Sequence, residues 1–410
     1  MRIPDARLPL TLAALTAATL LGAPPAAAAD PVAPVLLSGP GLVTGAVDVS
    51  PLGVVVGMSG PAEPFPGEPA QAARPYRWLP GPDGTFLAQA LTVPADATVA
   101  VVDGVTNAGA AGGFVGTAAG NTATRWPVTG GAPKSIAATP STVAAVGPAQ
   151  LLVETPPPPD EFGGALELVR ADGTRADVDA VVPNPEIVRA FVGGTVGGPD
   201  AVSFGVFAGA GWGSTIQPWK WVAGAGEPLP VRSVALIGSA CVSPIQRDGT
   251  IAYSGMIVEE RRYVVGISRG GVPGTVSELP VPEGLTGDLN CGANQVTWPD
   301  ALHADGTVVG YLSNGEAAIW RDGVLTRVAP EGGETAVRAA AVGSRGRVVL
   351  VATATDGTQQ PYLLRDGVRQ PLQLPAGWAL RDVVELTDTG IVLGNVSGAD
   401  GAVRPVVWRT

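Results

Sequence analysis

Short runs of β-branched residues recur along the chain, and each follows a polar turn that ends in glycine. The clearest copies occupy residues 50–57, 303–310 and 387–394, with the form turn–Gly–x–Val–Val–Gly or close to it. After a spacer, each leads to an aromatic or apolar strand that ends in tryptophan and arginine or tryptophan and leucine. Alternating runs separated by Asp-Gly turns predict β-hairpins. No segment shows sustained helical periodicity with caps, so we expect almost no helix.

The glycine that opens each run marks a repeat, and the spacing of these glycines gives its mean size. Gly53 and Gly390 are 337 residues apart (390 − 53), which over seven steps gives about 48 residues per unit. Clear markers between them lie at Gly109, Gly249, Gly306 and Gly346, and degenerate copies lie at 143–154 and 187–207. Four short strands with their turns need about 40–50 residues, the size of a propeller blade. We therefore expect eight blades, with seven as the alternative because the middle units are degenerate.

The four strands of a unit are an apolar approach to the turn, the β-branched run, the tryptophan strand and a short edge strand. Residues 34–41 resemble the edge strand and linker at 371–377, whereas the last unit stops just after its tryptophan strand at Trp408. This offset predicts that the N-terminal strand completes the last blade and closes the propeller. The fold class expected is a closed all-β propeller of four-stranded blades.

The repeated phrase resembles the HAF-type extracellular repeats of exported bacterial proteins, which are expected to form β-propellers. The resemblance is carried by the units near Gly53, Gly306 and Gly390. It departs at 124–126, 318–320 and 361–363, where the family usually has Ala-Phe. The resemblance implies no catalytic residues.

The N-terminus and the charge balance indicate an exported protein. Residues 1–29 have a weakly basic start, an apolar stretch and an Ala-Ala-Ala cleavage site, which predict a signal peptide before a single domain at 30–410. Removing them takes away two arginines and one acid, leaving 23 basic and 35 acidic residues, a net charge of about −12. This balance disfavours nucleic acid and anionic membranes as partners. We expect a secreted or cell-wall-associated monomer.

Two cysteines and one histidine limit the chemistry. Cys241 and Cys291 in an exported chain predict one disulfide, with two buried free thiols as the alternative. His303 occupies a turn position that is mostly polar in the other units, so we expect it to form local hydrogen bonds. No metal-binding signature is present, and we expect neither metal nor cofactor.

Tryptophan gives the best indication of recognition. Five tryptophans occupy the repeat position and should pack as core: Trp78, Trp126, Trp221, Trp320 and Trp408. Trp212, Trp298 and Trp378 lie outside that position, and we take them as candidate ligand-binding residues, with loop packing as the alternative.

The main functional hypothesis is a non-catalytic binding or scaffold propeller acting on an extracellular glycan or protein. The alternative is a carbohydrate-active hydrolase or lyase that uses acidic residues. The densest acidic pairs, Asp160-Glu161 and Glu259-Glu260, fall in spacers, where charge usually keeps a loop solvated. An enzyme would need two carboxyl groups converging in one concave site with shifted pKa values, and a binder would need an exposed aromatic patch without such a pair.

Overall fold

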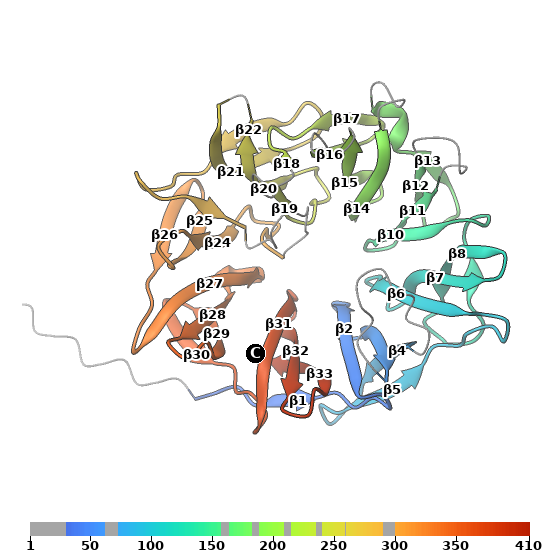
Figure 1. The fold of residues 1–410 in the computed structure, drawn as a ribbon, viewed down its shortest axis with the longest axis horizontal. Helices are drawn as coiled ribbons and strands as arrows, with labels where there is room; N and C mark the ends of the chain where they lie inside the picture. Colours follow the sequence, from blue (N-terminus) through green and yellow to red (C-terminus); the bar gives the residue numbers. More distant parts are fainter. Residues whose placement is uncertain are drawn as a thin grey trace, which may run out of the picture.

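Antiparallel strands form nearly all of the regular structure. The computed structural model describes residues 30–61, 73–156, 164–182, 188–208, 215–234, 240–258, 260–289 and 300–410. Within these ranges the helices are short 3-10 turns such as η1 (Asp179–Val181) and η4 (Ser344–Gly346), and no helix could cross a membrane. Figure 1 shows the sheets following one another around a common centre, as in a β-propeller. The expected all-β class is confirmed.

Most of the sheets are meanders of consecutive strands, and one joins the last strands of the chain to the first. The strands of the N-terminal half are β2 (Val43–Val49), β3 (Val55–Gly60), β4 (Arg74–Pro80), β5 (Phe86–Ala90); β6 (Val99–Val105), β7 (Ala111–Thr117), β8 (Gly120–Trp126), β9 (Lys134–Ser135); β10 (Thr142–Val146), β11 (Leu151–Thr155), β12 (Ala165–Val169), β13 (Arg175–Asp177); β14 (Val188–Gly198), β15 (Ala201–Ala208), β16 (Thr215–Val222), β17 (Ala225–Pro228) and β18 (Ser233–Val234).

The strands of the C-terminal half follow the same order, with the first strand of each sheet nearest the centre in Figure 1. They are β19 (Cys241–Val242), β20 (Ile251–Ile257), β21 (Arg262–Arg269), β22 (Thr275–Glu278); β23 (Gly287–Asp288), β24 (Val308–Leu312), β25 (Ala317–Arg321), β26 (Val324–Val328); β27 (Glu334–Val342), β28 (Val348–Ala354), β29 (Gln359–Arg365), β30 (Val368–Pro371); β31 (Trp378–Leu386), β32 (Ile391–Gly398) and β33 (Val403–Arg409).

The two ends of the chain meet in one sheet. Strand β1 (Pro34–Leu36) pairs antiparallel with β33, so that Pro34 lies opposite Trp408. Strand β2 touches β33 at a single parallel pair, Val43 with Val403. The N-terminal strand therefore lies at the outer side of the sheet formed by β31, β32 and β33.

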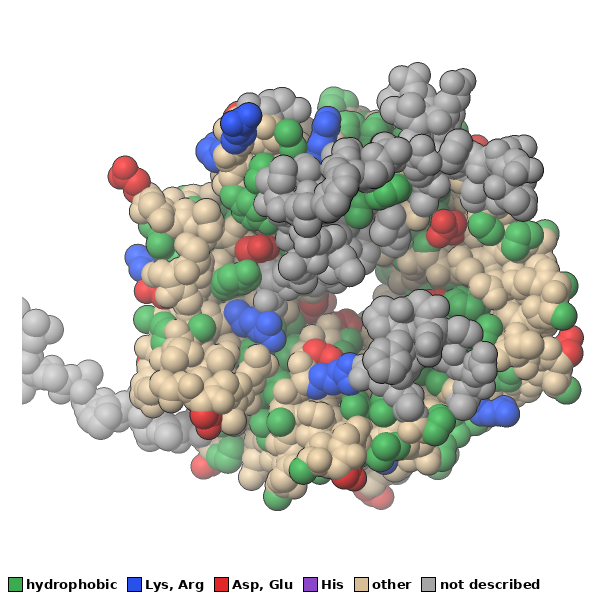
Figure 2. All heavy atoms as spheres, in the orientation of Figure 1, with side chains coloured by type: hydrophobic (Ala, Val, Ile, Leu, Met, Phe, Trp, Pro, Cys, Tyr) green, Lys and Arg blue, Asp and Glu red, His purple; other side chains and the backbone are tan. Residues whose placement is uncertain are grey.

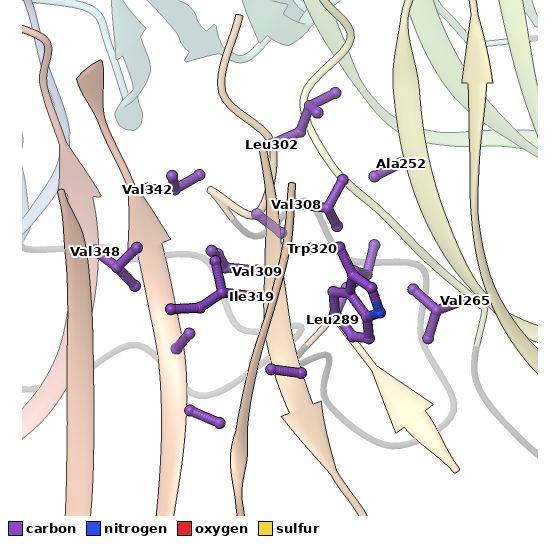
Figure 3. Packing of buried hydrophobic residues seen from close by; sticks show 14 of the residues in the cluster. Ala252, Val265, Leu289, Leu302, Val308, Val309, Ile319, Trp320, Val342 and Val348 are labelled. Carbon is purple, nitrogen blue, oxygen red and sulfur yellow. The ribbon is translucent and has the colours of Figure 1, made fainter. Parts of the chain in front are cut away.

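The repeat tryptophans form the core that was expected of them. All five are at most 2% exposed: Trp78, Trp126, Trp221, Trp320 and Trp408. Four of their indole N–H groups donate to a carbonyl in the connector that leads into the same sheet; the Trp320 Nε1 to Pro280 O distance is 2.7 Å. Figure 3 shows Trp320 among apolar side chains that include Leu289 and Val265. These four indoles thus fix both a sheet and its connector.

The Val-Val-Gly phrase has its cause in a β-bulge of the innermost strand. In β2 the pairing register shifts between Ala46 and Asp48, and Gly57 lies opposite Ala46. A Cβ at Gly57 would overlap the carbonyl oxygen of Gly45 and would lie 2.8 Å from the Ala46 Cα. Gly113 and Gly394 face bulges of β6 and β31 in the same way. In these three hairpins glycine leaves room for the backbone of the bulged inner strand.

Buried cations connect neighbouring sheets at equal spacing. Lys220, which is fully buried on β16, donates to the carbonyl oxygens of Gly270 and Gly271 at 3.1 and 2.9 Å. Arg77 holds the same place before a tryptophan on β4 and donates to the carbonyl oxygens of Pro127 and Val128. In both cases the acceptors lie 50 and 51 residues further along the chain. We call these contacts the cation latches.

Candidate active site: carboxyl groups at the centre of the propeller

The innermost strands bring acidic side chains to the central opening. Figure 2 shows an opening at the centre of the molecule with acidic side chains on part of its wall. Strand β2 contacts β6 on one side and β31 on the other. Side chains at the ends of these strands therefore come close together, although they are far apart in the sequence.

Asp48 follows the bulge of β2 and reaches the neighbouring strand β6. Its Oδ2 accepts a hydrogen bond from the Val105 backbone N–H at 2.7 Å, and its Oδ1 accepts one from Val49 N–H at 2.7 Å. A side chain at Gly104 would collide with this carboxyl group, because a Cβ there would lie 2.9 Å from Asp48 Oδ2. The bulge and the small neighbour thus direct Asp48 between two inner strands.

Two further carboxyl groups repeat this arrangement around the centre. Glu385 follows the bulge of β31 and interacts with the Val49 backbone N–H and with the Asp48 carboxyl group. Asp300 accepts a hydrogen bond from Leu386 N–H at 3.2 Å. The donor residues Val105, Val49 and Leu386 each end an innermost strand. We call Asp48, Asp300 and Glu385 the carboxyl cluster.

Burial and mutual repulsion keep protons on the carboxyl cluster. All three side chains are half-buried. Burial, followed by the charges of Asp48 and Asp300, raises the pKa of Glu385 well above its usual range. Burial also raises the pKa of Asp300 to about 7 and raises that of Asp48. Neutral and ionised carboxyl groups therefore coexist at one place near neutral pH, as acid–base catalysis requires.

His303 links the carboxyl cluster to the surrounding turns. Its Nε2 lies 2.9 Å from Asp388 Oδ1, and its Nδ1 lies 3.0 Å from Asp305 Oδ1. Ser344 N–H also donates to Asp388 Oδ1 at 3.0 Å, so that turns of three sheets meet at this aspartate. The charge of His303 lowers the pKa of Asp300. The expected local hydrogen bonding of His303 is thus observed, and the contact to Asp388 adds a link between sheets.

Other acidic groups of the inner strands lie apart from the carboxyl cluster. Asp103 is the extra residue in the bulge of β6, and burial among protein atoms raises its pKa to about 7. Asp382 accepts a hydrogen bond from Asn395 Nδ2 at 2.8 Å, and the same amide bonds to both backbone groups of Ala46. Within the described ranges, no group of three or more metal-ligating side chains could hold a metal ion.

The structure places some of the predicted site residues and not others. Trp378 begins β31 and packs half-buried against the core of that sheet. Trp212 and Trp298 lie outside the described residues, so binding by these tryptophans stays a prediction. Cys241 is buried on β19, whereas Cys291 also lies outside the described residues, and the disulfide stays a prediction.

Of the acidic pairs considered from the sequence, the structure describes only Glu260. Asp160, Glu161 and Glu259 lie outside the described residues. Glu260 is an exposed side chain that pairs with Arg262 at 2.8 Å. A signal for the actual site was present in the repeat itself, because Asp48 and Glu385 each stand two residues before the polar turn position held by Ser50 and Thr387.

Comparison with known proteins places the fold but gives no family. No family model matches the chain, and no curated protein matches it. Among solved structures, the chain is similar to the β-propeller domain of the Trilobed protease from Pyrococcus furiosus, which is described as having an open velcro topology. The TM-score is 0.47 and the sequence identity is 9%, over 89% of this chain and 92% of that one.

Puromycin hydrolase is also similar, with a TM-score of 0.48 and 13% identity over 92% of this chain and 61% of that one. A mutant of that hydrolase complexed with PGG has a TM-score of 0.46 and 14% identity, over 90% of this chain and 58% of that one. The chain thus spans about three fifths of the length of puromycin hydrolase. At these identities the likeness concerns the fold.

The main hypothesis of a non-catalytic binding or scaffold protein is wrong. The solved structures to which the chain is similar include the β-propeller domain of a protease and a hydrolase. Two interacting carboxyl groups, Asp48 and Glu385, also have raised pKa values, which is one part of the condition set for an enzyme. The sequence reasoning missed this site because it searched for acids that were adjacent in the chain.

Proposed function

We propose that this protein is a hydrolase that cleaves glycosidic bonds by acid–base catalysis at the carboxyl cluster. The observation that carries the proposal is the convergence of Asp48 and Glu385, on separate inner strands, with Asp300 in the segment before β24, all with raised pKa values. Paired carboxyl groups of which one is neutral and one ionised are the chemistry of glycoside hydrolysis.

Each carboxyl group has a distinct role in the proposed reaction. Glu385 is the general acid, because it retains its proton to high pH and passes it to the oxygen of the leaving sugar as the glycosidic bond breaks. Asp300 is the general base: it takes a proton from the water whose oxygen forms the new bond to the anomeric carbon. Asp48 is a positioning residue, since its charge and its hydrogen bond hold the Glu385 proton in place. After one turnover, proton exchange with solvent restores both groups.

The reaction should then depend on pH in a defined direction. Asp300 must be ionised and Glu385 protonated, so activity should rise as the pH passes about 7 and fall only where Glu385 loses its proton. A pH profile of kcat/KM, measured with a glycan that the protein hydrolyses, tests whether Asp300 loses its proton at a lower pH than Glu385.

The deciding experiment is a reducing-sugar assay of the protein against neutral and acidic polysaccharides, with a peptide substrate alongside. Glu385→Gln and Asp300→Asn should each lower kcat by about 100-fold or more. Asp103→Asn is the matched control, since it removes an inner-strand carboxyl group outside the carboxyl cluster and should retain activity. Hydrolysis of the peptide alone, or equal activity in all variants, would refute the proposal.

We also propose that the sheets form a closed ring of eight blades, secreted as a monomer after removal of residues 1–29. The pairing of β1 with β33 and the sequence of the signal-like segment support this. End-on views by electron microscopy would count the blades, and N-terminal sequencing of secreted protein should begin at Asp30. Light scattering would give the mass in solution.

A further inference from the structure

A pocket lies beside the sheet formed by β27, β28, β29 and β30, where β28 turns into β29 and where the chain enters β27. Its volume is about 580 Å³, and its wall extends to Leu374, after β30. Four charged or amide side chains line it: Glu331, Glu334, Gln360 and Arg369. We call it the glutamine pocket. A volume of this size suits a small ligand or one side chain of a larger one.

The amide group of Gln360 is held in one orientation. Its Nε2 donates hydrogen bonds to the carbonyl oxygens of Pro361 and Leu372 at 2.9 and 2.8 Å. Both N–H groups of the amide are used in this way, so the position of its oxygen is fixed as well. None of the described residues donates a hydrogen bond to Gln360 Oε1, which is left as an acceptor on a residue that lines the glutamine pocket.

The equivalent glutamine of another sheet shows what binds such an oxygen. Gln217 on β16 stands before a proline and an aromatic residue, as Gln360 does on β29, and its Nε2 likewise donates to two backbone carbonyl groups. Its Oε1 accepts a hydrogen bond from Arg232 Nε at 2.5 Å. Arg232 follows Gln217 by 15 residues (232 − 217), and the same step from Gln360 leads to Pro375 (375 − 360), which carries no donor. A guanidinium group therefore occupies in one sheet the place that the chain does not fill in the other.

The charge of the glutamine pocket suits a cation. Among the lining residues, Glu331 and Glu334 face the guanidinium group of Arg369, so one negative charge is unbalanced. Arg369 Nη1 lies 2.9 Å from Glu334 Oε2 and is paired with it. The Glu331 side chain is 73% exposed and lies 3.7 Å from Arg369 Nε, so its carboxylate can still accept short hydrogen bonds from a second cation.

We propose that the glutamine pocket binds an arginine side chain of a basic peptide, whose guanidinium group donates to Gln360 Oε1 and to the Glu331 carboxylate. A guanidinium group carries its N–H donors in one rigid plane, so it can bond to an amide oxygen and a carboxylate at once. Tyr362 adds an aromatic side chain to the wall, and guanidinium groups pack well against aromatic rings.

The overall charge of the protein favours the same partner. The mature chain carries a net charge of about −12, which attracts basic segments to its surface. The glutamine pocket shares no residue with the carboxyl cluster. Binding of the peptide therefore does not depend on the proposed hydrolase, and either proposal can fail without the other.

Binding of N-acetylarginine methylamide, the shortest peptide unit that carries this side chain, tests the proposal by calorimetry. Pro375→Arg should weaken binding about tenfold or more, because it tethers a competing guanidinium group at the position that Arg232 holds in the other sheet. Glu331→Gln should weaken binding about threefold or more. Its matched control is Glu283→Gln, which should leave the affinity unchanged: Glu283 is an exposed residue in the same Pro-Glu-Gly sequence of the preceding connector, outside the pocket lining.

Two further ligands separate the possible outcomes. N-acetylcitrulline methylamide has the same shape without the charge and should bind about tenfold more weakly or less. Equal binding of this compound, or unchanged affinity in Pro375→Arg, would overturn the proposal. Equal or tighter binding of N-acetyllysine methylamide, with its free side-chain amine, would overturn the assignment to arginine, because an ammonium group lacks the planar fork. Circular dichroism verifies the fold of each variant, and if Pro375→Arg does not fold, Glu331→Gln beside Glu283→Gln decides the question.

Discussion

Replacing Gly57 by alanine should destabilise the protein, because this glycine of the repeated phrase faces the bulge that precedes Asp48 in the proposed active site. The new Cβ would overlap the Gly45 carbonyl oxygen and lie 2.8 Å from the Ala46 Cα. Both obstacles are backbone atoms of β2, which cannot rotate away as a side chain could. Overpacking of this kind costs about 3 kcal/mol at the upper end of its usual range.

This cost can be converted into a melting temperature. An unfolding entropy of about 2.1 cal/mol/K per residue gives about 0.8 kcal/mol/K for the mature chain, so a loss of about 3 kcal/mol lowers Tm by about 4 °C. Circular dichroism during heating and a urea titration would both measure it. Because Asp48 follows the same bulge, activity should fall as well.

Gly45→Ala is the control for this experiment. It lies on β2 in the same hairpin, yet the atom nearest to its Cβ would be Asn395 Oδ1 at 3.9 Å. Alanine should be tolerated there or stabilise the strand slightly. If Gly57→Ala proved as stable as Gly45→Ala, the explanation of the Val-Val-Gly phrase by a bulged inner strand would be wrong.

Three further outcomes are expected. Lys220→Met should lower the free energy of unfolding in urea by about 3–5 kcal/mol, because it leaves Glu227 and two carbonyl groups without their buried cation. Arg125→Met, at the same place on β8, should lower it by less than about 1 kcal/mol. Equal losses in the two variants would show that the cation latch does not stabilise the protein. The pKa of Asp103, raised from 3.8 to about 7, means that its stabilising contribution is present below about pH 4 and is lost as the pH rises to 7; because Asp103 is exposed and solvent screens its charge, Tm should fall only slightly over this range, and less still in Asp103→Asn. Peptide mapping without reductant should find Cys241 joined to Cys291, and Cys291→Ser should then cost about 4 kcal/mol, as a loop of about 50 residues predicts; two alkylated thiols would contradict this.

The sequence predicted the parts of the fold that each repeat determines by itself. Trp320 and the other four repeat tryptophans are core because their units place a large apolar ring in the same strand. The turn at Gly53, where φ is positive, is likewise determined within its own unit and comes just before a strand. The degenerate segments at 143–154 and 187–207 also form hairpins, as expected.

The carboxyl cluster could not be found by such local reasoning. Asp48 and Glu385 are 337 residues apart, and they meet only because β2 and β31 lie side by side around the centre. Within one unit, each looks like a polar residue on an alternating strand. Aligning the units on their turns would have shown acids at the same place in two of them, and the bulge that aims these side chains has no sequence signature except the facing glycine.

The pairing of β1 with β33 also has a consequence for biogenesis. During synthesis Pro34 is made 374 residues before Trp408 (408 − 34), the residue opposite it in the sheet. Strand β1 therefore has no partner strand until β33 has been made. A contact this distant in sequence forms slowly and leaves an unpaired edge exposed in the meantime. A holding chaperone, or export of the chain before it folds, would shield that edge until the last strand arrives.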